Sequence, residues 1–341
     1  MPLKVATTKK ASSGSTVTNR NMNNNTTRFE IIKCHGSGND FIMVDTTTDK
    51  ALLNVDWEAF ARIACHRERG IGSDGVLLLV RHDDGVFGMD MLNPDGTHAE
   101  MCGNGIRCVA RLATERGYLE NGEGTLRSGG KDYRVATAEP ISSGIEAFAA
   151  DIPIRCWSND FSFYAPDESF VGKPIEKLDD KLSFTALNLG NPHITAHVDK
   201  IDMELLRSLG ERVTRLPELF PHGVNVSLYE WRAKNEIFVA TYERGAGITL
   251  SCGTAMTASA TASTLLRIVD KGARVKVRNR GGQVFCTTTI SDNRIVTRLE
   301  GNATFVWSGS AEFGTHHFSY QIVNHTDEDH RWQAFVNSLN H

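Results

Sequence analysis

The seven cysteines of this 341-residue chain lack the patterns by which cysteine usually holds a fold together. Their number is odd, no Cys-x-x-Cys pair occurs, and no His-x-x-x-His motif stands near them. These absences argue against a disulfide framework and against a metal site such as structural zinc, and they fit a reducing cytosol. Most of the cysteines are therefore expected to be small, buried apolar residues.

The chain also lacks an apolar run of the roughly 20 residues needed to span a bilayer. Its formal net charge is only −4, so electrostatics gives no reason to expect a nucleic acid or a membrane as partner. Hydrophobic residues make up 40% of the chain and charged residues 23%, as in ordinary globular proteins. At this length two domains are expected.

Residues 1–28 contain no acidic residue and are rich in Thr, Asn and Ser. Such a segment buries too little apolar surface to fold, so it is predicted to be a disordered tail. It lacks the apolar stretch of a secretory signal. An organelle transit peptide is the second interpretation of this composition, but the amphipathic pattern of such peptides is missing, and a cytoplasmic location is preferred.

From Phe29 onward, short predicted strands alternate with a few helices. A helix capped by Asp56 is expected in the first half, because Trp57, Phe60 and Ile63 recur at helical spacing. The other helices are expected at 103–116, 253–269 and 327–339. Strands are expected at 29–34, 41–45, 76–80 and 87–92, and near 184–189, 194–198, 224–229 and 237–242.

Two cysteines stand in matching settings about half the chain length apart. Cys102 lies in Glu-Met-Cys-Gly-Asn-Gly and Cys252 in Leu-Ser-Cys-Gly-Thr, and a predicted helix follows each. This repetition indicates a duplicated fold with one acid–base group in each half. A planar carbon intermediate between the two thiols would lose a proton on one face and regain it on the other, which is a stereochemical inversion.

Removing the weakly acidic hydrogen of an amino-acid α-carbon needs an electron sink or a tightly arranged site. No cradle for pyridoxal phosphate is evident, and Gly36-Ser-Gly38 lacks the third glycine and the following helix of a dinucleotide fingerprint, so no cofactor is predicted. A cysteine at a helix N-terminus has its pKa lowered from roughly 8.5 by the helix dipole and free amides. The same amides, at Gly103, Asn104, Gly253 and Thr254, are predicted to hold a substrate carboxylate.

A series of motifs then resembles one family in content and in order. These motifs are Cys34-His-Gly-Ser-Gly-Asn-Asp-Phe-Ile-Met-Val-Asp45, Gly70-Ile-Gly-Ser-Asp74, Asn93-Pro-Asp-Gly96, Met101-Cys-Gly-Asn-Gly-Ile-Arg-Cys108, Gly190-Asn-Pro-His193, Val224-Asn225, Glu243-Arg-Gly-Ala-Gly247 and Cys252-Gly-Thr254. Through them the chain resembles diaminopimelate epimerases from about Phe29 to about Ser310.

The resemblance implies cofactor-independent conversion of LL- to meso-diaminopimelate, in lysine and peptidoglycan biosynthesis, by an enzyme that is often a homodimer. It implies an α+β fold of two pseudo-symmetric domains, each a curled, mostly antiparallel sheet around a central helix. We expect the domains at 29–150 plus 301–341 and at 151–300, with the site between them.

The resemblance also assigns roles to residues of this sequence. It makes Cys102 and Cys252 the two bases, and His193 and Glu243 the residues that tune the thiols. A guanidinium fork suits the carboxylate at the non-reacting end of diaminopimelate. The residues expected to bind this small-molecule substrate are Asn39, Asn93, Asn191, Asn225, Glu243 and Arg244.

Three positions depart from the family pattern. Ile248 stands where glutamate is usual, Ala255 where glycine is common, and Gly75 where some members place a substrate-facing glutamine. These changes leave the two-thiol mechanism intact and bear on the substrate. A same-fold racemase of histidine or proline is therefore an alternative, although the proline type carries histidine at the position of Asn104. A thiol redox protein is a further alternative, but it would leave the asparagines, Arg244 and Glu243 unexplained. A ligand-binding module without activity would bind diaminopimelate without bringing solvent deuterium into the α-position.

Overall fold

The computed structural model describes residues 26–166, 168–292 and 294–339. Most of the predicted disordered tail, residues 1–25, lies outside this part of the chain. Thr27 and Arg28 already belong to the first strand, so regular structure begins two residues before the predicted boundary. Within the described residues, no helix has the length and hydropathy that crossing a membrane requires.

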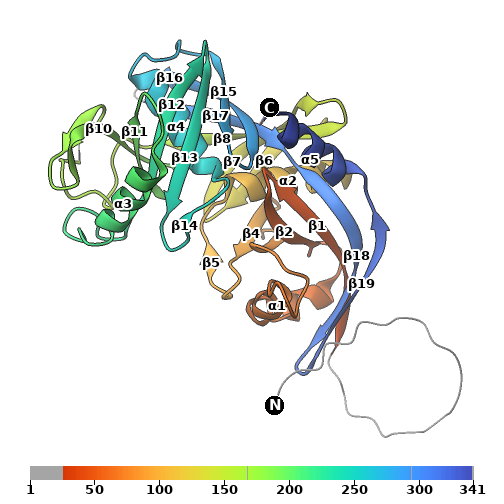
Figure 1. Ribbon diagram of the computed structural model, residues 1–341. Coiled ribbons are helices and arrows are strands. Elements are labelled where there is room, and N and C mark those ends of the chain that lie inside the picture. Colours follow the sequence, from red (N-terminus) through yellow and green to blue (C-terminus); the bar gives the residue numbers. More distant parts are fainter. Residues whose placement is uncertain (1–25, 167, 293, 340–341) are drawn as a thin grey trace, which may run out of the picture.

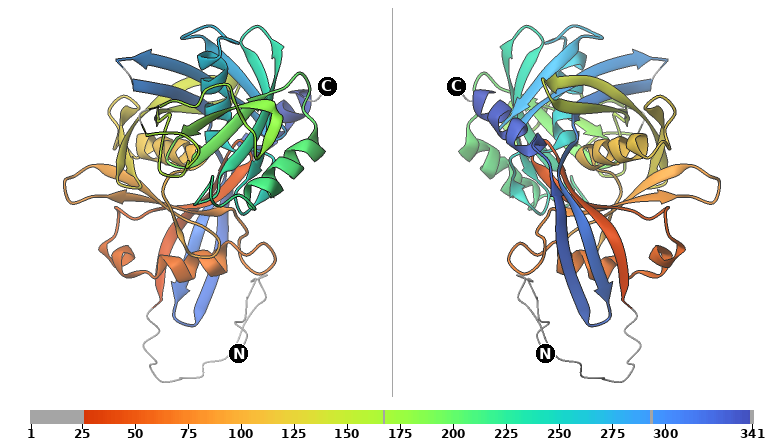
Figure 2. Two further views of the ribbon diagram at one scale, coloured as in Figure 1. Left: turned by 90° about the vertical axis from the view of Figure 1, so that its left-hand side faces the viewer. Right: turned by 90° about the vertical axis from the view of Figure 1, so that its right-hand side faces the viewer.

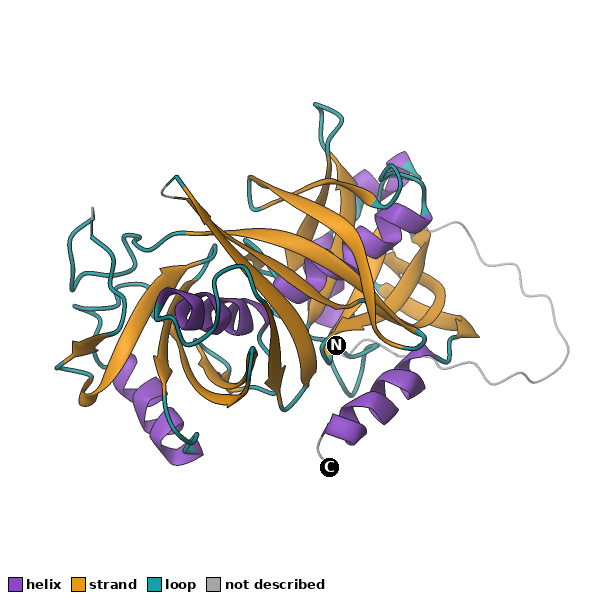
Figure 3. Cartoon of the chain, turned by 90° about the horizontal axis from the view of Figure 1, so that it is seen from above, coloured by secondary structure: helices purple, strands orange, loops and turns teal. Residues whose placement is uncertain are grey.

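The first half of the chain forms a curled sheet around one central helix (Figure 3). The helix predicted to begin after Asp56 is confirmed, and the Asp56 carboxylate caps it by accepting a hydrogen bond from the amide of Ala59. The elements of this half are β1 (Thr27–Gly36), β2 (Asn39–Asp45), η1 (Lys50–Asn54), α1 (Trp57–Ala64), β3 (Gly75–Arg81), β4 (Phe87–Leu92), β5 (His98–Ala99), α2 (Gly103–Glu115), β6 (Glu123–Ser128), β7 (Lys131–Ser142) and β8 (Ile145–Ile154).

The second half repeats this order and this pairing. β2 and β3 are parallel, as are β11 and β12, and the parallel pair of β4 with β6 recurs as β13 with β15. The elements of this half are β9 (Lys173–Ile175), β10 (Asp179–Asn188), β11 (Pro192–His197), α3 (Met203–Val213), β12 (Asn225–Ala233), β13 (Glu236–Glu243), β14 (Gly247–Ile248), α4 (Gly253–Leu265), β15 (Arg274–Asn279), β16 (Gly282–Ser291) and β17 (Arg294–Asn302).

One strand pairing joins the two halves, and a second returns the end of the chain to the first half. β8 pairs with β17 antiparallel from Ile154↔Ile295 to Ala147↔Asn302, so one mixed sheet runs through both halves. After β17, the chain returns to the first half, where β18 (Thr304–Gly314) pairs with β1 and is followed by β19 (His317–His325) (Figures 1 and 2). These pairings support the proposed division into domains at 29–150 plus 301–341 and at 151–300.

β2 and β3 are apolar on both faces because a helix covers each face. Phe41 and Leu77 pack in the cluster around α2, whereas Ile42 and Val76 pack in the cluster around α1. In the second half α4 lies inside and α3 outside in the same manner. Such near-continuous apolar strands are expected where a sheet is buried on both sides.

The predicted end of the helix after Cys252 is wrong by four residues. α4 stops at Leu265, although the sequence pattern favours a helix to Val269. Arg267 adopts a left-handed φ of 59°, and the amide of Ile268 donates to the Ser263 carbonyl over 2.8 Å, which closes a Schellman motif. In α2 the same turn uses Gly117, whose residue type made that helix end predictable.

The chain closes with α5 (Glu328–Leu339), which confirms the predicted C-terminal helix. Of its apolar stripe, Trp332 is fully buried and the other members are partly covered. Trp332 contacts the His35 ring of β1 and lies against Gly282 of β16, so this helix touches strands of both halves. An ion pair between Arg111 and Glu328 also attaches the helix to α2.

Candidate active site

The two cysteines occupy equivalent positions at the starts of the central helices. Cys102 is the N-cap residue of α2 with φ −135° and ψ 114°, and Cys252 is the N-cap residue of α4 with φ −130° and ψ 110°. Each helix is 13 residues long, and the predicted starts at Gly103 and Gly253 are confirmed. The first amides of a helix have no acceptor within it, so both thiols adjoin free N–H groups.

The two helix N-termini meet at their glycines. A Cβ atom on Gly103 would lie 3.8 Å from the backbone of Gly253 and Thr254, and one on Gly253 would lie 2.8 Å from Oδ1 of Asn104. A side chain at Gly253 would therefore push the two helix ends apart, whereas one at Gly103 would be in ordinary contact with the other helix. The contact brings two sets of free amides to one place, where the positive ends of both helix dipoles favour an anion.

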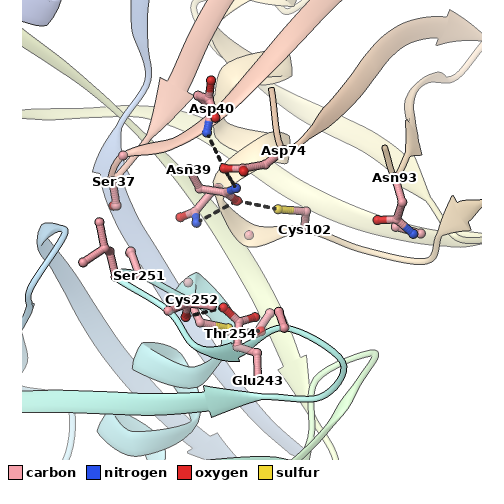
Figure 4. A pocket seen from close by; sticks show the side chains of 18 of the residues that line it. Ser37, Asn39, Asp40, Asp74, Asn93, Cys102, Glu243, Ser251, Cys252 and Thr254 are labelled. Carbon is pink, nitrogen blue, oxygen red and sulfur yellow. Dashed lines mark hydrogen bonds between the residues drawn. The ribbon is translucent and has the colours of Figure 1, made fainter. Parts of the chain in front are cut away.

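A cavity of about 800 Å³ opens at this contact, and both thiols face it (Figure 4). Its lining includes polar groups from both halves and the apolar side chains of Met91, Ile248 and Leu250. The predicted site residues that line it are Asn39, Asn93, Cys102, Gly103, Asn104, Asn191, Glu243, Cys252, Gly253 and Thr254.

Around Cys102, hydrogen bonds come from its own helix and from β2. The amide of Gly105 donates to the thiol sulfur over 3.4 Å. The amide oxygen of Asn39 lies 3.7 Å from the same sulfur and accepts from Nδ2 of Asn104 over 3.3 Å. The thiol thus has an amide donor on one side and a carbonyl acceptor on the other.

Around Cys252, the neighbours are a hydroxyl, a carboxyl group and, one step further, an imidazole. Oγ1 of Thr254 lies 3.5 Å from the sulfur, and Nε2 of His193 lies 3.1 Å from that hydroxyl. Burial lowers the pKa of His193 to about 3, with a smaller contribution from Arg244, so this ring is neutral. Glu243 accepts from the Thr249 hydroxyl over 2.5 Å, and burial raises its pKa.

The expectation that the helix ends lower the thiol pKa values is wrong for the protein alone. Burial raises the pKa of Cys102 to about 11, although the amides of Gly105 and Asn104 act in the opposite direction. Burial, followed by the neighbouring Glu243, raises the pKa of Cys252 as well. Desolvation of a thiolate here outweighs the helix amides. The consequence is a thiolate that is scarcer but more basic, which suits a weakly acidic α-hydrogen.

Sequence comparison bears directly on this two-thiol site. The family model described as diaminopimelate epimerase matches residues 31–138 and 185–306, which include both cysteines. The chain belongs to the diaminopimelate epimerase family. Among curated members, it is 35% identical to the diaminopimelate epimerase of Clostridium acetobutylicum, over 92% of this chain and 93% of that protein. It is 33% identical to the one of Ligilactobacillus salivarius, over 91% of this chain and 99% of that protein.

Solved structures show that other enzymes share the fold of this diaminopimelate epimerase family member. A Bacillus anthracis phenazine biosynthesis protein of the PhzF family superposes with a TM-score of 0.59 at 15% identity, over 83% of this chain and 99% of that one. A hydroxyproline epimerase from Agrobacterium vitis superposes with a TM-score of 0.57 at 14% identity, over 84% of this chain and 92% of that one. At such identities the likeness concerns the fold alone.

Three residues that the family resemblance assigns to the site lie outside the cavity lining. His193 is fully buried behind Asn191 and Thr254. Asn225 is buried and accepts from the backbone amide of Arg244 over 2.9 Å. The guanidinium of Arg244 donates to the carbonyl of His222, on the exposed side of its loop.

The cavity also contains charged residues to which the sequence assigned no role. Asp40, Arg67 and Asp74 line it and are joined by ion pairs, with Arg67 to Asp40 at 2.8 Å and to Asp74 at 2.6 Å. Asp74 ends the Gly70-Ile-Gly-Ser-Asp74 motif of diaminopimelate epimerases, so a signal was present in the sequence. Arg67 lies in no such motif, and only the fold brings it to the cavity.

Proposed function

We propose that this protein is a diaminopimelate epimerase that inverts one α-carbon with two cysteines and no cofactor. The observation that carries the proposal is the pair of equivalent N-cap cysteines facing one cavity from the two halves of a duplicated fold. Membership of the diaminopimelate epimerase family supports the same substrate.

In this mechanism the substrate carboxylate binds where the helix N-termini meet, at the free amides that follow Cys102 and Cys252. One cysteine, as thiolate, removes the α-proton, and the electron pair stays on a planar carbanion whose charge spreads into that carboxylate. The other cysteine, as thiol, donates its proton to the opposite face, so protons balance and the two sulfurs exchange protonation states. Preorganised N–H donors at the two helix ends stabilise the carbanion, which replaces an electron sink.

The far end of a diaminopimelate carries a second ammonium and a second carboxylate, and polar residues beyond the thiols are suited to both. Asn93 and Asn191 line the cavity and offer amide donors and acceptors, and Glu243 offers a carboxyl group for the ammonium. Arg244 follows Glu243 directly, and its exposed side chain has to turn from the His222 carbonyl to reach a carboxylate. His193 and Asn225 act from behind, because they hold Asn191, Thr254 and the backbone of Arg244.

The proposal also covers the cellular compartment and the oligomeric state. A diaminopimelate epimerase serves lysine and peptidoglycan biosynthesis, which fits a cytoplasmic enzyme with reduced thiols, and the seven cysteines are free, as this requires. We also propose a homodimer through the first half. In the family resemblance, an aromatic residue that supports this contact corresponds to Trp307 of β18, which is 8% exposed.

The function is tested by comparing substrates in D₂O and following exchange of the α-hydrogen by NMR. We expect LL-diaminopimelate to incorporate deuterium and to form the meso isomer faster than histidine or proline reacts. A monocarboxylic amino acid leaves the distal polar groups unpaired, which costs binding energy. Faster turnover of histidine or proline would mean that the substrate is wrong while the two-thiol chemistry stands. Exchange with none of the three would contradict both.

Replacement of Arg244 by lysine tests the distal carboxylate contact. Lysine keeps the charge but loses the planar fork that binds a carboxylate through two parallel hydrogen bonds. We expect kcat/KM for LL-diaminopimelate to fall by about tenfold or more. The matched control is Arg232→Lys, which changes an exposed arginine at the end of β12, outside the cavity lining. Equal kinetics in Arg244→Lys and Arg232→Lys would exclude Arg244 from substrate binding.

A further inference from the structure

The duplicated fold places an asparagine at the same position in each half. The parallel pairing of β2 with β3 begins at Phe41 and Gly75, and the equivalent parallel pairing of β11 with β12 begins at His193 and Asn225. By this register, Asn39 of the first half corresponds to Asn191 of the second. Both line the cavity, one on the side of each cysteine.

The two asparagines present opposite ends of their amides. Oδ1 of Asn39 faces the sulfur of Cys102, whereas Nδ2 of Asn191 faces the hydroxyl of Thr254 beside Cys252, over 3.3 Å. The orientation of Asn191 follows from His193, whose Nε2 lies 3.0 Å from Oδ1 of that amide. A different residue sets the orientation in the first half.

That residue is Asp74. Its Oδ2 accepts from Nδ2 of Asn39 over 2.7 Å and from the backbone amide of Asp40 over 3.1 Å (Figure 4). Its Oδ1 accepts from Arg67 over 2.6 Å. An ionised carboxylate can only accept hydrogen bonds, so the NH₂ end of the Asn39 amide must face it and the oxygen must face away. The oxygen then lies between Cys102 and Asn104.

The carboxylate of Asp74 has no counterpart in the second half. The same register places Val224 there, a buried apolar residue that cannot orient an amide. The carboxylate therefore breaks the equivalence of two halves that otherwise share their helix starts and strand pairings.

We propose that Asp74 is a positioning residue, which turns the oxygen of the Asn39 amide toward Cys102 and so holds that thiol as a proton donor. An acceptor oxygen favours S–H over a thiolate, and a flipped amide would offer an N–H group and favour the thiolate instead. The resting protein thus has one cysteine prepared to give a proton. This inference rests on the proposed role of Cys102 as an acid–base group.

Other titratable and charged groups also face this pair. Arg107 and Cys108 face Cys102 from its own helix, and Glu243 and Cys252 lie across the cavity. Lys33 and Arg67 bind Asp40 beside Asp74. Burial and Asp40 raise the pKa of Asp74, and the Asn39 amide opposes this shift.

The test measures alkylation of Cys102 by iodoacetamide at about pH 8.5, followed by mass spectrometry of the Cys102 peptide in the full-length Cys252→Ala protein. Asp74→Ala removes the shorter of the two hydrogen bonds that orient the Asn39 amide and leaves the longer one from Nδ2 of Asn104. We expect alkylation to become about tenfold faster, as for a fall of about one pKa unit. Asp40→Ala removes an equal charge without touching Asn39 and should accelerate the reaction much less. Asp74→Asn keeps an oxygen for Asn39 and should react nearly as the parent does.

A double-mutant cycle decides whether Asp74 acts through Asn39. In an Asn39→Ala background, Asp74→Ala should add no more than Asp40→Ala adds. A full tenfold gain in that background, or equal rates for Asp74→Ala and Asp40→Ala, would overturn the proposal. If Asp74→Ala does not fold, fast alkylation of Asn39→Ala with slow alkylation of Asp74→Asn supports it, and equal rates for those two overturn it. Alkylation needs no substrate, so the result is independent of whether diaminopimelate is turned over.

Discussion

Replacing either Cys102 or Cys252 with alanine should abolish epimerisation while the protein stays folded. Inversion needs a proton acceptor on one face and a donor on the other, so one remaining thiol cannot complete it. We expect turnover of LL-diaminopimelate to fall by at least about a thousandfold in each variant. The thermal transition should change little, because each thiol borders the cavity and not a packed interior. Cys156→Ala, at a half-buried cysteine outside the cavity lining, is the control and should keep normal turnover.

The two alanine variants should still differ in which isomer exchanges hydrogen. In D₂O the remaining cysteine can remove the α-hydrogen that faces it and return deuterium to the same face without inversion. Deuterium should therefore enter one isomer in Cys102→Ala and the other isomer in Cys252→Ala, as measured by NMR. Exchange of the same isomer in both variants, or normal turnover in either, would contradict the assignment of one cysteine to each face.

Gly253→Ala should reduce kcat/KM for diaminopimelate by about a hundredfold, although the change adds only a methyl group. The new Cβ would lie 2.8 Å from Oδ1 of Asn104, which is held by Nη2 of Arg107 over 3.0 Å. Asn104 cannot yield without breaking this buried contact, so the start of α4 has to move. A displacement of about 1 Å at a reacting centre is enough for a loss of this size. Steady-state kinetics on both isomers would measure it.

The matched control for this variant is Gly272→Ala, in the turn before β15. Gly272 has a φ of +73° and open space around it, so alanine there strains the backbone far from the cavity. We expect it to lower the free energy of unfolding by about 1 kcal/mol and to leave kcat/KM unchanged. Similar kinetics for the two variants would show that the contact between the helix ends is not needed for catalysis.

Local sequence signals predicted the two helix starts well, because a cysteine, a glycine and a run of small residues are all adjacent in the chain. The pairing of the strands has no such signal. β8 pairs with β17 and β1 with β18, and contacts across so much chain depend on the register of whole strands. The resemblance to a family supplied the curled sheet and the cleft, which periodicity did not.

The residues of the site likewise include some that the sequence could predict and some that it could not. The free helix amides and the motif matches together led to ten residues that line the cavity. They could not distinguish a lining residue from one behind it, as His193 and Asn225 are. They also could not give the thiol pKa values, since a helix end argues for a lower value and the amount of burial is unknown before the fold. The network of Lys33, Asp40, Arg67 and Asp74 joins three separate segments, so its contacts became visible only in space.

The seam between β8 and β17 has a mechanical consequence for the cavity. Leu299 belongs to this seam, and a Cβ on Gly103 would lie 2.9 Å from its side chain, so the meeting point of the two helices adjoins the seam. In a rotation of one half against the other about that line, an atom travels in proportion to its distance from it. The amides that hold the carboxylate would move little, whereas the residues farther from the seam, such as Asn93 and Leu250, would move more. A hinge at this seam would therefore let the cavity open for a bulky molecule with two zwitterionic ends without dismantling the place where its reacting carbon binds.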